Sequence, residues 1–358
     1  MKLPKTPEST TGSDTPQSIW DKVITSTPVV MTVLATLLAG LSSSESNQAQ
    51  YYRSISAQNQ SKAGDQWNFF QAKKLRSANS TSSVKLLRNL GDVGPFTTEA
   101  ITTTASHLIQ NLKSNPSGTT VARELQTQID SLMADADVKN AMELLTTQLP
   151  PAQALVIADS KTRTAYDILK KNEGDSTPPI IFGEVKPEAI RDSIRAADQN
   201  VKKSDTELQP AMTGMAKIEK LLDRLAGVSV SMRRSATQSA TRSTFAATDR
   251  ETPGEVRQLA ADYTLAELRF EAARLEREAK LNQQSAYLYE VAVRKTSWQS
   301  DRSLIRSRYF FYGMLGAQAA VLIATFSLAV RERSWMWSLA ASIGLMATAY
   351  AGYVYLYT

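Results

Sequence analysis

Two long uncharged stretches near the end of the chain constrain its fold more than any other feature. Residues 309–330 contain no charged side chain, and residues 334–358 form a second such stretch. Each is long enough to cross a hydrocarbon core of roughly 30 Å, which takes about 20 helical residues. Only Arg331, Glu332 and Arg333 separate them. The pattern predicts a transmembrane hairpin, and the alternative is a pair of buried helices in a soluble domain.

A third apolar segment lies near the start of the chain. Residues 23–44 carry no charge, although several threonine and serine side chains dilute their hydrophobicity. Pro28 suits the first turn of a helix or a kink. A cleaved signal peptide, with Lys2 and Lys5 as its charged region, is the alternative. We favour an uncleaved membrane anchor, because the polar tail before this segment is long for a signal peptide.

Residues that flank the three expected spans predict their placement in a membrane. Basic residues are more frequent beside the large middle region than at the hairpin turn or before the first span. The positive-inside rule therefore predicts that the middle region is cytoplasmic. Aromatic residues suited to headgroup depth are Tyr309, Phe310, Phe311, Tyr312, Trp335, Trp337, Tyr353, Tyr355 and Tyr357.

The region between the spans has a helical pattern interrupted by glycine and proline. Gly91 to Pro95 should end one helix, and the middle region should then contain helices at 97–113, 119–149, 152–171 and 185–230. We expect a loop or short extended segment at 172–187, and a linker or weakly packed helix at 229–250. The expected organisation is a disordered tail (1–17), a first transmembrane helix (18–44), a juxtamembrane helical motif (45–90), a helical extramembrane domain (91–250), a long coiled-coil-like helix (251–308) and two final transmembrane helices (309–330 and 334–358).

The segment before the hairpin has a seven-residue repeat. Residues 255–308 lack glycine and proline, so one helix should continue into the second span. Alanine in the repeat would allow a close helix partner, and Asn282 would favour one register. That partner is either the protein's own middle region or a second copy. The repeat consists of Leu265, Ala272, Ala279, Ala286 and Val293, with Leu268, Leu275, Asn282 and Tyr289 three places on.

Small residues at four-residue spacing mark the expected hairpin. Pairs of this kind let membrane helices approach closely, against each other or against a neighbour. The pairs are Gly316 with Ala320, Ala340 with Gly344, and Ala347 with Ala351.

The sequence offers little for catalysis. It has no cysteine and a single histidine, His107, which excludes a metal site that needs several nitrogen or sulfur ligands. Asp130, Asp135 and Asp137 lack the pattern of a calcium-binding loop, so we interpret them as a solvated helix face. No phosphate-binding loop or nucleophile motif is present. We therefore predict no catalytic residues, cofactor, metal or small-molecule substrate, and the net charge of +6 favours anionic lipid over nucleic acid.

A dense aromatic and basic string follows the first span. Its residues are Asp65, Gln66, Trp67, Phe69, Phe70, Gln71, Ala72 and Lys73, with Gly64 where another small residue is expected. This string resembles the hallmark of a bacterial membrane family catalogued as domain of unknown function 4337. The final hairpin is also similar to that family's closing pair of spans, and the resemblance covers about a third of the chain. It implies a membrane topology and, because the family's function is unknown, no particular activity.

The helical spacing of this string predicts a docking element. Asp65 and Phe69 share a face, as do Gln66 and Phe70. We expect the string either to lie along the membrane surface or to dock against the base of the long helix near Trp298. The whole pattern predicts an all-α bacterial inner-membrane protein with three transmembrane helices. Its predicted role is a non-catalytic scaffold or accessory subunit of a homo-oligomer or larger membrane complex, and the alternative is a membrane sensor.

Overall fold

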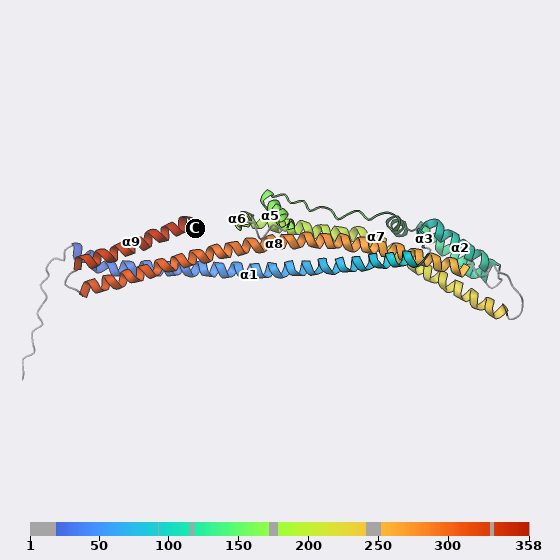
Figure 1. Cartoon of the computed structure of the whole chain (residues 1–358), viewed down its shortest axis with the longest axis horizontal. Coiled ribbons are helices and arrows are strands. Elements are labelled where there is room, and N and C mark those ends of the chain that lie inside the picture. Colours follow the sequence, from blue (N-terminus) through green and yellow to red (C-terminus); the bar gives the residue numbers. More distant parts are fainter. Residues whose placement is uncertain are drawn as a thin grey trace, which may run out of the picture. The chain divides into compact units, whose positions relative to one another are not determined.

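The computed structural model describes residues 19–91, 93–114, 118–171, 178–240, 252–329 and 333–357, which are mostly helical and contain no strand. The predicted tail at 1–17 lies outside them. The predicted all-α class is therefore confirmed for the described part of the chain (Figure 1). Its helices are α1 (Ile19–Leu90), α2 (Thr98–Lys113), α3 (Thr119–Ala134), α4 (Ala136–Thr146), α5 (Ser160–Lys170), α6 (Ile180–Gly183), α7 (Pro187–Ala240), α8 (Thr252–Ala329) and α9 (Arg333–Tyr357).

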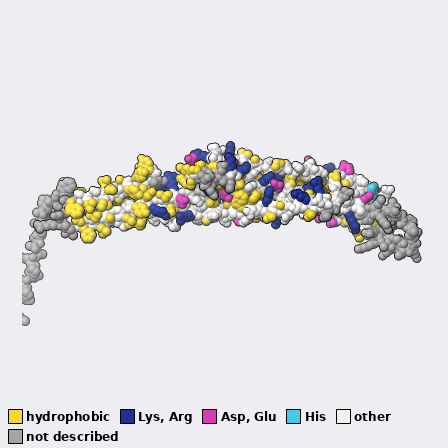
Figure 2. Space-filling view, in the orientation of Figure 1, with side chains coloured by type: hydrophobic (Ala, Val, Ile, Leu, Met, Phe, Trp, Pro, Cys, Tyr) yellow, Lys and Arg dark blue, Asp and Glu magenta, His cyan; other side chains and the backbone are white. Residues whose placement is uncertain are grey.

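Three of these helices are long and apolar enough to cross a membrane, as the sequence predicts. They are α1, α8 and α9, and the apolar parts lie near the start of α1, near the end of α8 and along α9. On the face shown in Figure 2, apolar side chains gather over this part of the molecule. The three candidate spans are the feature on which the membrane assignment rests.

The chain divides into two compact units. Among the described residues, unit 1 contains those up to Gln58, Pro178–Gly183 and those from Val293 onward, and unit 2 contains the remainder. Two helices, α1 and α8, contribute residues to both units.

Unit 1 holds the candidate spans together with small residues. Ala320 and Ala340 are fully buried, and Gly344 lies against the flexible end of Met31. A Cβ added at Gly316, which is half-buried, would lie 3.6 Å from Cβ of Ala347. These predicted small-residue positions therefore pack within the chain's own helices. The buried cluster of the spans consists of Ala35, Leu38, Phe310, Ala317, Ala351 and Val354.

Unit 2 is built around a conventional aliphatic core. Residues from α2, α3, α4, α7 and the first part of α8 form it, and Phe96 from the loop before α2 joins them. The ring of Phe96 meets that of Tyr263 edge to face at 5.2 Å. Largest among the fully buried side chains of this core are Ile101, Leu108, Leu125, Val138, Ile218 and Leu225.

Two aspartates shape the middle region in ways that differ from the sequence analysis. The expected helix at 119–149 is interrupted at Asp135, whose carboxylate accepts the N–H groups of Asp137 and Val138 and thereby begins α4. The helix expected from residue 152 begins only at Ser160. Asp159 caps it by accepting the N–H of Thr162 at 2.8 Å. In both places the cap satisfies helix N–H groups that otherwise lack partners, which stabilises a new helix start.

Elsewhere helices are longer than expected. The segments 18–44 and 45–90 form one helix, α1, because the glycines within it cost only about 1 kcal/mol each in a helix. Helix α7 extends to Ala240 through part of the expected linker at 229–250, and residues 241–250 lie outside the described part. The expected loop at 172–187 contains the short helix α6.

Candidate functional site

The α1–α8 pair is the candidate site, because it contains the aromatic string and the predicted seven-residue repeat. In unit 1, serine hydroxyls of one helix reach backbone carbonyls of the other. Each step of seven residues along α1 matches a step of seven back along α8, as two antiparallel helices require. The bonds are Ser42 to the carbonyl of Ser307 (2.9 Å), Ser307 to that of Ser42 (2.8 Å), Ser300 to that of Ala49 (3.0 Å) and Ser56 to that of Val293 (3.4 Å).

In unit 2 residues of α1 and α8 pair in the same seven-residue register, but ion pairs also join the two helices. The hydroxyl of Ser77 donates to the carbonyl of Ala272 at 2.9 Å. Nζ of Lys73 lies 2.9 Å from a carboxylate oxygen of Glu278, which also pairs with Arg274. Both partners of the Lys73–Glu278 pair are mostly buried, so this pair is shielded from solvent more than a surface pair is.

Trp67 is the centre of the predicted docking string. Its indole N–H donates to a carboxylate oxygen of Glu290 at 2.6 Å. The indole also meets Phe70 (5.5 Å) and Tyr287 (5.2 Å) edge to face. Tyr287 in turn meets Tyr166 of α5, and burial raises the pKa of the Tyr166 hydroxyl to about 12. The indole therefore lies against α8, two turns before Trp298 along that helix.

The string has a second, outward face. Asp65 and Gln71 are exposed, and Gln66 is half-buried. Phe69 is 55% exposed, and Leu75, one turn and a half further along α1, is 65% exposed. The same short sequence thus provides an inner face that holds α8 and a wide outer face, on which the uncovered Phe69 and Leu75 point in different directions because about 600° of helical rotation separates them.

The repeat predicted on α8 is largely buried, and all of it except Val293 lies in unit 2. Leu265, Ala272, Leu275, Ala279 and Asn282 are all buried, and Leu268 is half-buried. The sequence left two partners open for this stripe, and in the structure the chain itself covers it. Within the described residues, the amide nitrogen of Asn282 is buried and has no hydrogen-bond partner.

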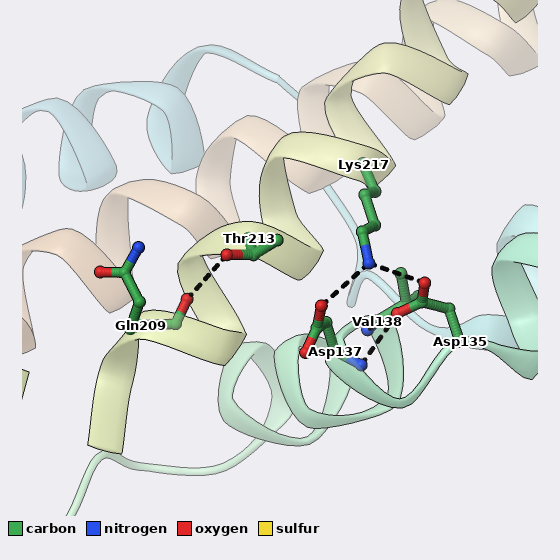
Figure 3. A network of polar contacts seen from close by, with 6 residues as sticks. All are labelled: Asp135, Asp137, Val138, Gln209, Thr213 and Lys217. Carbon is green, nitrogen blue, oxygen red and sulfur yellow. Dashed lines mark hydrogen bonds and ion pairs between the residues drawn. The ribbon is translucent and has the colours of Figure 1, made fainter. Parts of the chain in front are cut away.

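Two of the three aspartates interpreted as a solvated face, Asp135 and Asp137, instead bind a lysine (Figure 3), whereas Asp130 is exposed as expected. Nζ of Lys217 on α7 lies 2.7 Å from Asp135 and 2.9 Å from Asp137. The bond from Lys217 lowers the pKa of the Asp135 carboxyl, and the two carboxylates raise the pKa of Lys217. Here α4 and α7 approach closely, because a Cβ added at Gly214 would collide with the backbone carbonyl of Asp137.

Two further features have chemical potential. His107 lies 3.1 Å from a carboxylate oxygen of Glu255, and both side chains are exposed. A cavity of about 250 Å³ lies beside Asp262, whose buried carboxylate accepts the N–H of Gly94 at 2.7 Å. No group of three or more His, Cys, Asp or Glu side chains that could hold a metal ion occurs in the part of the chain that the structure describes.

The serines of α1 were missed in the sequence analysis, although a signal was present. Their positions and those of intervening alanines recur at multiples of seven residues, matching the spacing found on α8. Residues of this repeat are Ala35, Ser42, Ala49, Ser56, Ala63 and Ser77. The shared seven-residue repeat is the sequence signal that α1 and α8 pair.

Comparison with known proteins places the similarity in the first part of the chain. No curated protein and no solved structure matches the chain. A family model described as Domain of unknown function (DUF4337) matches residues 20–145. The match confirms the resemblance seen around Trp67, and it extends from α1 through most of α4.

Proposed function

We propose that the protein is a non-catalytic, membrane-anchored scaffold or accessory subunit that organises a homo-oligomer or a larger membrane complex. One observation carries this proposal: α1 and α8 each contain a candidate span and continue as uninterrupted helices into unit 2. In both units these helices are fastened to each other by polar side chains. Such fastening suits an anchor that holds an extramembrane domain in a defined register.

The outer face of the aromatic string is the proposed contact with another subunit. Phe69 and Leu75 are large apolar side chains that the chain itself leaves uncovered. Removal of such side chains from water contributes a gross free energy of about 25 cal/mol for each Å² of apolar surface, from which the entropy cost of association is subtracted. The inner face, with Trp67, would keep this outer face rigid and ready to bind.

The proposed location is a bacterial inner membrane, with the large middle region in the cytoplasm. The excess of basic residues on that side of the spans supports this orientation. Cysteine accessibility would test it directly, because the chain has no natural cysteine. A cysteine placed at exposed Val156 should react with a membrane-impermeant reagent only after the membrane is opened.

Crosslinking with mass spectrometry on native membranes tests the scaffold proposal. We expect reproducible crosslinks to a second copy or to a fixed set of neighbours, and a double variant Phe69→Ala and Leu75→Ala should weaken them several-fold. Val156→Ala is the matched control, because Val156 is an exposed apolar residue of the same unit, outside the string. Recovery of the wild type only as monomers without neighbours would contradict the proposal.

A sensor is the second candidate, and one observation favours it. The buried amide nitrogen of Asn282, without a partner among the described residues, is a costly feature of a single fixed packing. A second register of α1 and α8 that satisfies it would support signalling. Spin labels on engineered cysteines in the two helices would report such a change as a ligand-dependent shift in distance, whereas a scaffold should keep one distance.

A further inference from the structure

A stripe of arginines on α8 ends at the candidate membrane span. Arg294, Trp298, Arg302 and Arg306 follow one another at four-residue intervals, so they share one face of the helix. The uncharged span begins at Tyr309, immediately after Arg308. Arg302 and Arg308 are exposed, and they lie within about 10 Å of the span at 1.5 Å per helical residue.

For a bilayer centred on the candidate span, the headgroup layer lies at this part of α8. Headgroups add roughly 5–8 Å on each side of the hydrocarbon core, and an arginine side chain can extend several ångströms towards them. Exposed Phe311 and Tyr312 mark the edge of the apolar surface. Figure 2 shows Lys and Arg side chains directly beside the apolar surface of the candidate spans.

Helix α6 packs against the indole of Trp298, and the guanidinium of Arg302 lies over that indole. A Cβ added at Gly183 would lie 2.8 Å from three carbons of the Trp298 ring, so the backbone of Gly183 lies directly on the indole. The adjacent Phe182 is 1% exposed, and Nζ of Lys295 donates to the carbonyl of Gly183 at 3.1 Å. These contacts fix Trp298 in one orientation.

The guanidinium of Arg302 lies over the fixed indole, 5.4 Å from its centroid. A cation held on an aromatic face loses little further freedom when it binds an anion, and its N–H groups can still reach phosphate oxygens. The acidic groups nearby on the two helices are Glu45 and Asp301. Glu45 lies 4.0 Å from Arg306, and Asp301 is exposed. In this part of α1 and α8, Arg302, Arg306 and Arg308 thus outnumber these two carboxylates.

We propose that Arg302 and Arg308 bind the phosphate groups of anionic phospholipids, with Trp298 and Gly183 as positioning residues for Arg302. The side chains leave α8 in different directions, since six residues correspond to about 600° of helical rotation. They therefore bind separate lipid molecules. Exposed Ser43 and Ser44 of α1 lie at the same level, as the Ser42–Ser307 bonds show, and supply further hydroxyl donors.

Native mass spectrometry of the full-length protein, titrated with phosphatidylglycerol or phosphatidylcholine, tests this proposal. The wild type should bind phosphatidylglycerol more tightly. Arg302→Gln and Arg308→Gln should each weaken that binding about fivefold, the effect expected from one basic residue at an anionic surface. Binding of phosphatidylcholine should change little. Gly183→Ala should weaken phosphatidylglycerol binding without any change in charge, because it displaces the Trp298 ring.

Arg257→Gln is the matched control, because Arg257 is exposed on the same helix but lies in unit 2, far along the chain from the span. It should leave lipid binding unchanged. Equal affinity of the wild type for both lipids, or equal losses in Arg302→Gln and Arg257→Gln, would overturn the proposal. Competition by inorganic phosphate at a concentration similar to the lipid's would also overturn it, since the site would then bind free phosphate. Crosslinked partners unchanged in these variants would leave the scaffold proposal standing independently.

Discussion

In unit 1, serine hydroxyls make most of the polar contacts between α1 and α8, beside one Glu45–Arg306 pair at 4.0 Å, whereas ion pairs and an indole predominate in unit 2. The unit 1 bonds run from Ser42, Ser56, Ser300 and Ser307 to carbonyls of the facing helix. The unit 2 contacts include the Lys73–Glu278 pair and the bond from Trp67 to Glu290. A hydroxyl needs little desolvation and fits between closely spaced helices, so it suits the unit that contains the candidate spans.

The same pair of helices therefore uses one register with two chemistries. The ion pairs in unit 2 are partly accessible to solvent. Their charged side chains therefore lose only part of their hydration when the pairs form. Near a hydrocarbon core an unpaired charge is expensive, which favours hydroxyl bonds to backbone carbonyls there. Substitutions that remove one chemistry at a time can test whether each unit depends on its own kind of contact.

Substitution of glycine where two helices approach closely should have the largest effect on the free energy of unfolding. The size of this effect should differ between the units. Gly214→Ala in unit 2 should lower the free energy of unfolding by about 3 kcal/mol, because the new Cβ would collide with the rigid carbonyl of Asp137. Gly344→Ala in unit 1 should cost less, since the flexible end of Met31 can move. Denaturant unfolding in detergent, followed by helical circular dichroism, measures both.

Gly227→Ala is the control for this comparison, because nothing lies within 4 Å of a Cβ added there. It should stabilise α7 by about 0.5–1 kcal/mol. Similar losses for Gly214→Ala and Gly227→Ala would mean that the close approach of α4 and α7 is not required for stability.

Loss of the indole should have the next largest effect, in unit 2. Trp67→Ala should lower the free energy of unfolding by about 2–3 kcal/mol, somewhat below the range for a fully buried tryptophan because Trp67 is half-buried. It also leaves the Glu290 carboxylate without its indole donor. Phe69→Ala should change stability by about 0.5 kcal/mol or less, as expected for an exposed position. Equal effects in the same unfolding assay would contradict the division of the string into two faces.

Single hydroxyls should have smaller effects, and these should be larger in unit 1. Ser300→Ala removes the donor to the Ala49 carbonyl at a site that is 1% exposed, and it should cost about 1–2 kcal/mol. Ser77→Ala should cost about 1 kcal/mol in unit 2, where ion pairs also hold the helices. Ser82→Ala is the control, since exposed Ser82 bonds only to its own helix. Hydrogen exchange on α1 locates each loss, and protection unchanged by Ser300→Ala would show that the serine bonds are dispensable.

The Lys217 cluster should have the smallest effect near neutral pH and a distinctive pH dependence. The lowered pKa of Asp135 means that its contribution is present above its ordinary value of 3.8 and is lost as pH falls through the lowered pKa. The raised pKa of Lys217 means that its contribution is present below 10.5 and is lost as pH rises through the raised pKa.

Lys217→Met should therefore flatten the alkaline limb of a plot of unfolding free energy against pH. It should weaken the acid limb without removing it, because the N–H groups of Asp137 and Val138 still favour the ionised Asp135. Asp135→Asn should abolish the part of the acid limb due to Asp135. An alkaline limb that is identical in Lys217→Met and the wild type would contradict this account.

Features with a strong local signal were predictable. The absence of glycine and proline from 255–308 predicted the uninterrupted helix that became α8, and uncharged length predicted the three candidate spans. The starts of α4 and α5 were missed, although Asp135 and Asp159 are good capping residues. Apolar spacing across 119–149 favoured one long helix. In the structure Asp135 begins a new helix instead, because its carboxylate accepts backbone N–H groups directly.

The candidate site was predictable only in part. The string around Trp67 was predicted to be a docking element, but its inner and outer faces depend on where α8 lies. Lys217 and Asp135 are far apart in sequence, and nothing local marks them as partners. Gly183 and Trp298 are also far apart in the sequence, and no local pattern marks them as a contact.

By itself, the sequence determined the helical class, the candidate membrane spans and the seven-residue repeat of α8, because each depends on composition and spacing within one segment. Only the tertiary structure decided that this repeat is covered by the chain's own helices, and that α1 pairs with α8 mainly through serine bonds in one unit and mainly through ion pairs and an indole in the other. Those outcomes depend on contacts between residues more than 190 positions apart. Many helices could satisfy the same apolar stripe, and close packing with paired polar groups selects among them.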